Sequence, residues 1–431
     1  MITDIAEVEQ VVRVPDRPFS ENKPIRQFCR YCGFEYGIEG LAHCYDFAAW
    51  KLVDVERTII TPGWGAPGGE IISDYTSSGV RVPVNELQDL TAAIFKSTGM
   101  FDEDAFLLAD SLVTADLSGT HSHGILRVPE YVKKLTVDDV DPKGRPSVAS
   151  DRGGALVIDG NNSMGQINSA FAMKLAIGRA ENTGIAAAAV RGSNHNGALS
   201  YYTEMAVERG MIGLATTNAL PTMAPIGGAE RILGIDPLAI AIPANNEHPI
   251  SYDAAFSGTA HGKVRVYAQK GLELEPDWAL DSEGQPTTDP IKAIDGLLRP
   301  IGGHKGASLA LIMGVLSSML SGAAYNTELG NMQDGPIAGT DGHFFMAINV
   351  EFFVDPGEFT ARVDMAAKQV HDTRKAPGVN RTWMPGEREF VTREVNRVEG
   401  IPLSEESLAD LASAAKSQAV ATGSYDWLSN A

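Results

Sequence analysis

The amino-acid sequence predicts an α/β fold with more than one domain, on three observations. Short apolar runs of strand length alternate along the chain with longer segments of helical periodicity. The 431 residues are enough for two or three domains. Hydrophobic residues make up 44% of the chain and charged residues 21%, so a core can form without cross-links.

The regular pattern begins near residue 82. Helices are expected at 84–96, 103–115, 167–180, 198–208, 307–320, 358–371 and 404–421. Strands are expected at 155–158, 185–190, 212–216, 238–242 and 344–353, with a turn at 159–162. The apolar stretch 307–320 is too short to span a bilayer, so we expect a buried helix. Ser404 is the expected N-cap of the last helix.

The first 80 residues differ from the rest and predict a separate N-terminal module. They contain a run rich in proline and glycine at 61–69, whose glycines match G-x-G-x-x-G. We reject a dinucleotide-binding loop there, because Pro67 interrupts the motif and no helix follows it. Beyond this module we expect a helical part of a substrate domain at 81–150, a nicotinamide-binding domain at 151–325 and a return to the substrate domain at 326–431.

The three cysteines lie in the predicted N-terminal module as Cys29, Cys32 and Cys44. A close pair with a distant third ligand suggests a structural zinc site, although such sites usually have four ligands. The alternative is packed or free thiols.

The charge balance excludes some function classes. The chain has 35 Lys and Arg residues and 55 Asp and Glu residues, which gives a net charge of −20. This charge disfavours non-specific binding to nucleic acid or to anionic membranes. The start of the chain is acidic and lacks the apolar segment of a secretory signal. With few cysteines as well, we expect a cytoplasmic protein with neither nucleic acid nor membrane as a partner.

The segment 119–131 gathers groups that suit the chemistry of an oxo acid. His123, Arg127 and Tyr131 are four residues apart and would share one face of a helix. A guanidinium group binds a carboxylate in bidentate fashion, and an imidazole exchanges a proton near neutral pH. Ser122 adds a hydroxyl group. The alternative is a polar helix start with capping residues, with Pro129 marking a kink.

The segment 190–197 directly follows a predicted buried strand and precedes a predicted helix. Such loops are where α/β proteins place ligand-binding groups. His195 is therefore the candidate acid or base. The alternative is a turn in which Asn194 and Asn196 adopt left-handed conformations and His195 is merely solvated.

Further polar segments occur at 216–219, 233–237, 252–255 and 300–306. In the last of them, Gly302, Gly303 and Lys305 precede an apolar helix, so free amides and an ammonium group suit a phosphate. The alternative is a simple turn at a helix start with a surface lysine.

Taken together, these motifs give a family resemblance. From about residue 82 to the C-terminus, the chain resembles the type-2 malate/L-lactate dehydrogenase family, which includes ureidoglycolate, sulfolactate and diketogulonate enzymes and cyclic imino-acid reductases. The motifs occur in the family order. They are His121-Ser122-His123-Gly124 with Arg127 and Tyr131, Asp159-Gly160, Gly165-Gln166, Ser193-Asn194-His195, Thr217-Asn218, Gly234-Ile235-Asp236-Pro237, Asp253-Ala254, Gly262-Lys263-Val264, 286–290, Gly302-Gly303-His304-Lys305-Gly306 and Pro385-Gly386-Glu387.

The resemblance implies a homodimer whose nicotinamide-binding domain is unrelated to the Rossmann fold, with an active site between domains and near the partner subunit. It implies NAD or NADP as cofactor and a small 2-oxo or 2-hydroxy acid as substrate. His195 matches the proton-transferring histidine of the family, and Ser122, His123, Arg127 and Tyr131 match residues grouped around the substrate. The residues that match cofactor contacts are Asn218, Ala219, Asp253, Ala254, Ala255, Lys305, Pro385, Gly386 and Glu387.

Some positions depart from the family pattern. Asn196, Ala219 and His304 stand where the family usually has Phe, Ser and Tyr, and Ala255-Phe256 replaces Thr-Ser. These changes concern the substrate and the choice between NAD and NADP more than hydride transfer. The other readings are a cyclic imino-acid reductase of the same family and a non-catalytic binding protein whose N-terminal module recruits a partner.

Overall fold

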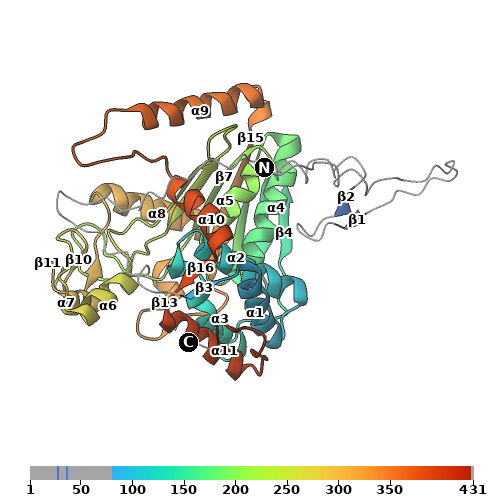
Figure 1. The fold of residues 1–431 in the computed structure, drawn as a ribbon. Helices are drawn as coiled ribbons and strands as arrows, with labels where there is room; N and C mark the ends of the chain where they lie inside the picture. Colours follow the sequence, from blue (N-terminus) through green and yellow to red (C-terminus); the bar gives the residue numbers. More distant parts are fainter. Residues whose placement is uncertain (1–26, 29–34, 37–79, 429–431) are drawn as a thin grey trace, which may run out of the picture. The chain divides into compact units, whose positions relative to one another are not determined.

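The computed structural model describes residues 27–28, 35–36 and 80–428 (Figure 1). The chain divides into two units, Met1–Ile71 and Ile72–Ala431. In the first unit, only the antiparallel pair of β1 (Gln27–Phe28) and β2 (Glu35–Tyr36) is described.

Several predictions concern residues outside this description. They are the N-terminal module at 1–80, the glycine motif at 63–68 and the candidate zinc ligands Cys29, Cys32 and Cys44. These stay predictions, and metal analysis of the purified chain tests the zinc site. The predicted domain boundaries at 150 and 325 also stay predictions.

A mixed seven-stranded sheet lies at the centre of the second unit. The pair β5–β6 is parallel, and every other neighbouring pair is antiparallel. A Rossmann sheet is mostly parallel, so the structure confirms the α/β class with a different sheet topology. In spatial order the strands are β4 (Ser147–Arg152), β5 (Ala155–Asp159), β6 (Ile185–Ser193), β15 (Asp341–Asn349), β7 (Met211–Thr217), β8 (Leu238–Ile242) and β9 (Ile250–Ala254).

Helices pack on both faces of this sheet (Figure 1). On one face, α4 (Gly165–Thr183) and α5 (Ser200–Val207) enclose a core with small and apolar residues of β5, β6, β7 and β15. On the other face lies α8 (His304–Ser318), whose Ser317 hydroxyl contacts the Thr216 hydroxyl of β7 at 3.5 Å. Alternate residues of the strands therefore face different helices, as the pleat requires.

A second core is built by the two ends of this unit. Its helices are α1 (Val84–Ser97), α2 (Asp102–Leu117), α3 (Val128–Thr136) and α11 (Glu405–Ser417), beside the antiparallel pair of β3 (Val80–Val82) and β16 (Ile401–Leu403). Met164 and Ile167, at the start of α4, also belong to this core. The core thereby places the residues around Tyr131 against the N-terminal end of α4.

A third, smaller core packs beside α8. It is formed by residues of α6 (His261–Lys270), α7 (Pro290–Asp295), α8 and the short strands β10 (Ala279–Leu280) and β12 (Leu297–Leu298). The strand β11 (Pro286–Thr287) pairs with β10. Two further helices follow the sheet, α9 (Pro356–Asp372) and α10 (Glu387–Glu399). The Asp364 carboxylate attaches α9 to the β8–β9 connection, because it accepts hydrogen bonds from the backbone N–H groups of residues 245–247.

The predicted elements are present with boundary shifts of a few residues. Ser404 caps α11 by accepting the Ser407 N–H at 3.1 Å, as predicted. The predicted turn at 159–162 is confirmed, with Asn161 and Asn162 at φ values of 49° and 57°. The predicted strand 344–353 is wrong at both ends, because β15 runs over Asp341–Asn349 and a 3₁₀ turn (Val350–Phe352) follows it.

One segment whose spacing suits a helix is not a single helix, and one predicted buried helix is partly exposed. The segment 119–131 is not one helix, because Gly124 adopts an extended conformation between two 3₁₀ turns, His121–His123 and Ile125–Arg127. Pro129 then lies in the first turn of α3, where proline is tolerated. The helix α8 is not buried on all sides, since Leu311 and Ile312 are 46% and 48% exposed.

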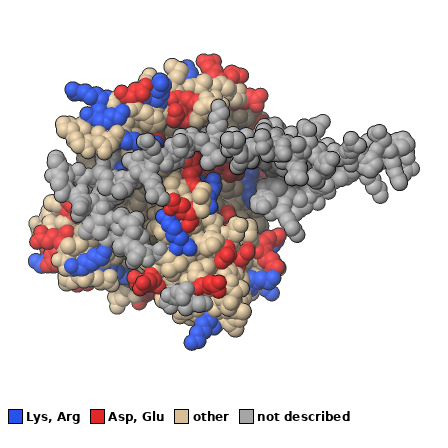
Figure 2. Space-filling view, viewed as in Figure 1, with Lys and Arg blue, Asp and Glu red and all other residues tan. Residues whose placement is uncertain are grey.

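Three further observations concern the surface charges, the helices and the metal-ligating side chains. In the face that Figure 2 shows, acidic and basic side chains are interspersed over most of the coloured surface. Within residues 80–428, no helix combines the length and the apolar character needed to cross a membrane. The same residues contain no cluster of three or more His, Cys, Asp or Glu side chains that could hold a metal ion.

Candidate active site

A buried aspartate fixes the segment that carries Ser122, His123 and Arg127. Asp116 of α2 is 1% exposed, and its carboxylate accepts the Ile125 N–H at 2.7 Å and contacts His121 Nδ1 at 2.7 Å. A Cβ atom at Gly124 would overlap this carboxyl group. Glycine is therefore required where the chain passes over Asp116, and the turn is held in one conformation.

The guanidinium group of Arg127 is held on two sides. Its Nε donates to the Ser122 carbonyl oxygen at 2.8 Å, and its Nη1 donates to Glu130 at 2.8 Å. The other oxygen of Glu130 lies 3.4 Å from Nζ of the buried Lys134. Glu130 thus bridges two cations, and the sequence pattern had singled out neither Glu130 nor Lys134.

The loop after β6 is buried and held by side-chain hydrogen bonds, so it is not a simple solvated turn. Asn194 and Asn196 are 4% and 2% exposed, and neither has a positive φ. The Asn194 side chain donates to the Ser163 carbonyl oxygen at 2.9 Å, and that of Asn196 donates to the Ser169 hydroxyl at 3.0 Å. A Cβ atom at Gly165 would overlap the backbone of this loop. The start of α4 therefore packs directly against His195.

His195 lies beside two of the other predicted residues, Tyr131 and His123. Its Nδ1 is 2.6 Å from the Tyr131 hydroxyl, which also accepts a hydrogen bond from the Gln166 amide at 3.1 Å. The rings of His195 and His123 are stacked, with centroids 5.9 Å apart. Ser122 Oγ lies 2.9 Å from His123 Nδ1. Tyr131 of α3 and His123 thus contact the imidazole directly, and Gln166 of α4 and Ser122 contact these two residues in turn.

Electrostatics keeps both imidazoles neutral in the free protein. Burial lowers the pKa of His195 well below its ordinary value, and the charges of Arg127 and Lys134 lower it further. Burial and Arg127 lower the pKa of His123 to about 4. Burial raises the pKa of Tyr131, so its phenol keeps its proton. A neutral imidazole beside a guanidinium group suits proton transfer next to a bound carboxylate.

The predicted cofactor residues gather at one edge of the sheet. Because β6, β7 and β9 run in the same direction, His195, Asn218–Ala219 and Ala254–Ala255 all follow carboxyl ends at this edge. From β6 to β9 there are four strand intervals, which is about 19 Å at ordinary spacing. Lys305 lies in the exposed first turn of α8.

Several of these residues have structural partners. The buried Asn218 amide group donates to Ser318 Oγ and to the Ala324 carbonyl oxygen, both at 2.9 Å, and accepts the Gly342 N–H at 3.0 Å. Asp253 accepts the Ser200 N–H at the start of α5 at 2.8 Å. The side chains of Asn218 and Asp253 are thus bonded within the protein and fix the carboxyl ends of their strands. The backbone groups of these two residues, and the residues next to them, are left to contact a cofactor.

The segment Pro385–Gly386–Glu387 is bonded to the first half of β9 through the backbone. The Pro385 carbonyl oxygen accepts the Ser251 N–H of β9 at 2.9 Å. Gly386 has φ 81°, and a Cβ atom there would overlap Ser251. The Glu387 carboxylate is 3% exposed and is paired with His371 and Arg381. Through these buried pairs, Glu387 fixes the position of the segment against β9.

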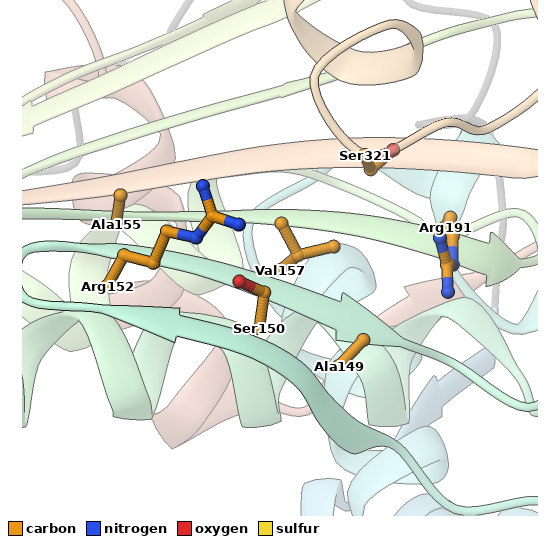
Figure 3. Close-up of a pocket in the computed structure, with 7 residues that line it drawn as sticks. All are labelled: Ala149, Ser150, Arg152, Ala155, Val157, Arg191 and Ser321. Carbon is orange, nitrogen blue, oxygen red and sulfur yellow. The ribbon is translucent and has the colours of Figure 1, made fainter.

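The surface depression in Figure 3 lies apart from these groups. It has a volume of about 380 Å³ and is lined by residues of β4, β5 and β6 and by Ser321. Arg152 and Arg191 lie at its two ends, and Arg191 is paired with Asp159 at 3.1 Å. None of the predicted site residues lines it.

Comparisons with known proteins agree with this fold. The family model described as malate/L-lactate dehydrogenase matches residues 82–412. A malate dehydrogenase of Pyrococcus abyssi is 38% identical over 340 residues, which are 77% of this chain and 93% of the relative. A Δ¹-pyrroline-2-carboxylate/Δ¹-piperideine-2-carboxylate reductase of Pseudomonas putida is 34% identical over 340 residues, 78% of this chain and 97% of the relative.

A solved structure shows the same architecture. The sulfolactate dehydrogenase of Methanocaldococcus jannaschii superimposes with a TM-score of 0.74 at 34% identity, over 79% of this chain and 98% of that chain. Fold and relatives together define a hydride-transferring oxidoreductase that acts on small hydroxy or oxo acids. Within that class, the chain belongs to the malate/L-lactate dehydrogenase family.

Proposed function

We propose that the protein is an NAD(P)-dependent dehydrogenase that transfers a hydride between nicotinamide and a small 2-oxo or 2-hydroxy carboxylic acid of the malate or lactate type. The observation that carries this proposal is the convergence of Tyr131, His123 and Arg127 on His195, at the sheet edge where a cofactor would lie. The low cysteine number supports a cytoplasmic location as part of the same proposal.

Each polar group has a defined role in this proposal. Arg127 binds the substrate carboxylate with the N–H groups that Ser122 and Glu130 leave free. Because Tyr131 occupies Nδ1 of His195, the Nε2 atom is the one that exchanges a proton with the substrate oxygen. The hydroxyl of Ser122 and the ring of His123 orient His195 or relay its proton.

The chain's own groups fit a nicotinamide dinucleotide. Lys305 and the amides after Gly302 and Gly303, which have φ values of 58° and 63°, offer an exposed cationic turn at the start of a long helix. The backbones of Asn218, Ala219, 253–255 and 385–387 border the sheet edge that leads from this turn toward His195. When bound, the nicotinamide ring supplies or accepts the hydride.

A binding and activity panel tests the proposal. The purified chain should bind NADH or NADPH, and it should oxidise one of them in the presence of a 2-oxo acid such as oxaloacetate, pyruvate or sulfopyruvate. Calorimetric titration gives cofactor affinity, and absorbance at the nicotinamide band gives turnover. Absence of cofactor binding would refute the proposal. Bound cofactor without turnover on any substrate would favour the non-catalytic reading.

The reductase similarity favours cyclic imine reduction as the second candidate. A cyclic imino acid also carries a carboxylate next to the reacting carbon, so Arg127 would have the same partner. Assays with a cyclic imine beside the oxo acids separate the two reactions, because the preferred substrate has the larger kcat/KM.

A homodimer is the proposed assembly, and the exposed face of α8 supports it. Solution light scattering should give twice the chain mass of 45.9 kDa. Exchange of Leu311 and Ile312, which are 46% and 48% exposed, for glutamate should shift the mass toward one chain. The matched control Val398→Glu, at an apolar residue of α10 that is 87% exposed, should leave the dimer intact. A wild-type mass of one chain would contradict the prediction.

A further inference from the structure

Asp236 is a buried carboxyl group with an unused oxygen. It precedes β8 and is 1% exposed. Its Oδ1 accepts the Ala219 N–H at 2.8 Å, whereas its Oδ2 is buried without a hydrogen-bond partner among the described residues. Buried oxygens without partners are rare, because burial removes their hydrogen bonds to water.

The fold provides a dedicated space for this carboxyl group. A Cβ atom at Gly234 would overlap Oδ1, and one at Gly314 of α8 would overlap Oδ2. Asp236 itself has φ 25°, a conformation that costs energy for a residue with a side chain. Two glycines and a strained backbone therefore hold the carboxyl group between α8 and the residues after β7.

No cation faces Asp236 within the described part of the chain. The groups around it are the Ala219 amide, the two glycines and the phenol of Tyr325. Burial raises the pKa of Asp236 to about 8, and the backbone N–H groups of Ala219 and of Asp236 itself oppose this shift only in part. The carboxyl group therefore carries a proton on its unused oxygen at neutral pH.

We propose that Asp236 is a positioning residue of the nicotinamide site that works as a neutral acid. It holds the backbone at Ala219, and its ionisation in alkaline solution displaces this backbone or α8 and weakens cofactor binding. The inference rests on the proposed function, since Asn218, Ala219 and Lys305 are the proposed cofactor contacts. A charge at Asp236 has no partner, so it draws water or moves one of these two elements.

The test measures NADH and NADPH affinity from pH 6 to pH 10 by calorimetry. In the wild type, the dissociation constant should rise about tenfold for each pH unit above the ionisation midpoint, since only the protonated form binds well. Asp236→Asn keeps the shape and the acceptor for Ala219 but cannot ionise, so its affinity should stay flat. The matched control Asp277→Asn, at a side chain that is 90% exposed, should follow the wild type.

Thermal unfolding, measured as a function of pH, tests the ionisation of Asp236 without relying on cofactor binding. In the unfolded chain Asp236 ionises near its ordinary pKa of 3.8, and in the folded chain near 8. The wild type should therefore lose stability relative to Asp236→Asn as pH rises from 4 to 8, and the difference should stay constant above 8.

The two proposals fail in different ways. If neither nucleotide binds at any pH, the proposed function fails while the unfolding experiment still tests the ionisation of Asp236. If the nucleotide binds and Asp236→Asn keeps the alkaline loss of affinity, or the wild type shows none, the inference about Asp236 is wrong.

Discussion

Replacement of His195 by alanine should lower turnover by about 10²- to 10⁴-fold, the usual contribution of a general acid or base. The Tyr131 hydroxyl at 2.6 Å orients the imidazole, and no other neutral imidazole in the site has a phenol on its Nδ1. Cofactor affinity should change little, because His195 is not one of the proposed cofactor contacts, which lie at β7 and β9. Steady-state turnover and calorimetric titration with NADH or NADPH measure the two effects separately.

A matched variant separates chemistry from general damage. His248→Ala removes a half-buried histidine that stacks on Phe390, and it should keep near wild-type turnover. If His195→Ala retains turnover, the proton passes through another group and the assignment of His195 is wrong. If cofactor binding is lost together with turnover, the His195→Ala substitution has damaged the structure of the site.

Local pattern predicted five of the seven strands of the central sheet and most of the long helices, but it did not predict how the sheet is ordered. Apolar spacing, which depends only on near neighbours, did not predict the strands β4 and β9 or the helices α6 and α10. The strand β15 lies between β6 and β7 although it comes much later in the chain. Its buried His343 contacts Thr217 at 2.7 Å and Ser193 at 2.8 Å, and these contacts have no signature in local periodicity.

The candidate site was partly predictable for a related reason. His195 could be found because a polar loop follows an apolar strand, and Ser122, His123, Arg127 and Tyr131 could be found because one short segment gathers them. The family resemblance added what these residues are expected to do. The supporting residues Asp116 and Glu130 were missed. Each lies on a helix where charged residues are common, and only the folded chain brings Asp116 to the Ile125 amide and Glu130 to Arg127.

The positions of the proposed cofactor residues show the same limit. Their place at the sheet edge follows once strand directions are known, but the partners of the Asn218 and Glu387 side chains do not. A motif indicates that a residue is needed at a position. It does not indicate whether the side chain contacts a ligand itself or fixes a backbone segment that contacts the ligand.

Loss of the Arg127 guanidinium group should have the second large effect. Arg127→Met should lower kcat/KM by about 10- to 150-fold, since a hydrogen bond to a charged group contributes about 1.5–3 kcal/mol. Arg127→Lys should recover only part of this, because an ammonium group cannot form the bidentate contact. The matched control Arg209→Met, at an exposed pair with Glu181, should be nearly silent.

The pH profile gives a second, independent readout of Arg127. Burial lowers the pKa of His195 most and the charge of Arg127 lowers it further, so removal of this charge should raise that pKa part of the way toward the ordinary 6.5. In hydroxy-acid oxidation, His195 must be neutral to accept a proton. The acid limb of kcat/KM should therefore move to higher pH in Arg127→Met and in no control. A loss of affinity without this displacement would place Arg127 at the substrate but too far from His195 for its charge to change the pKa of the imidazole.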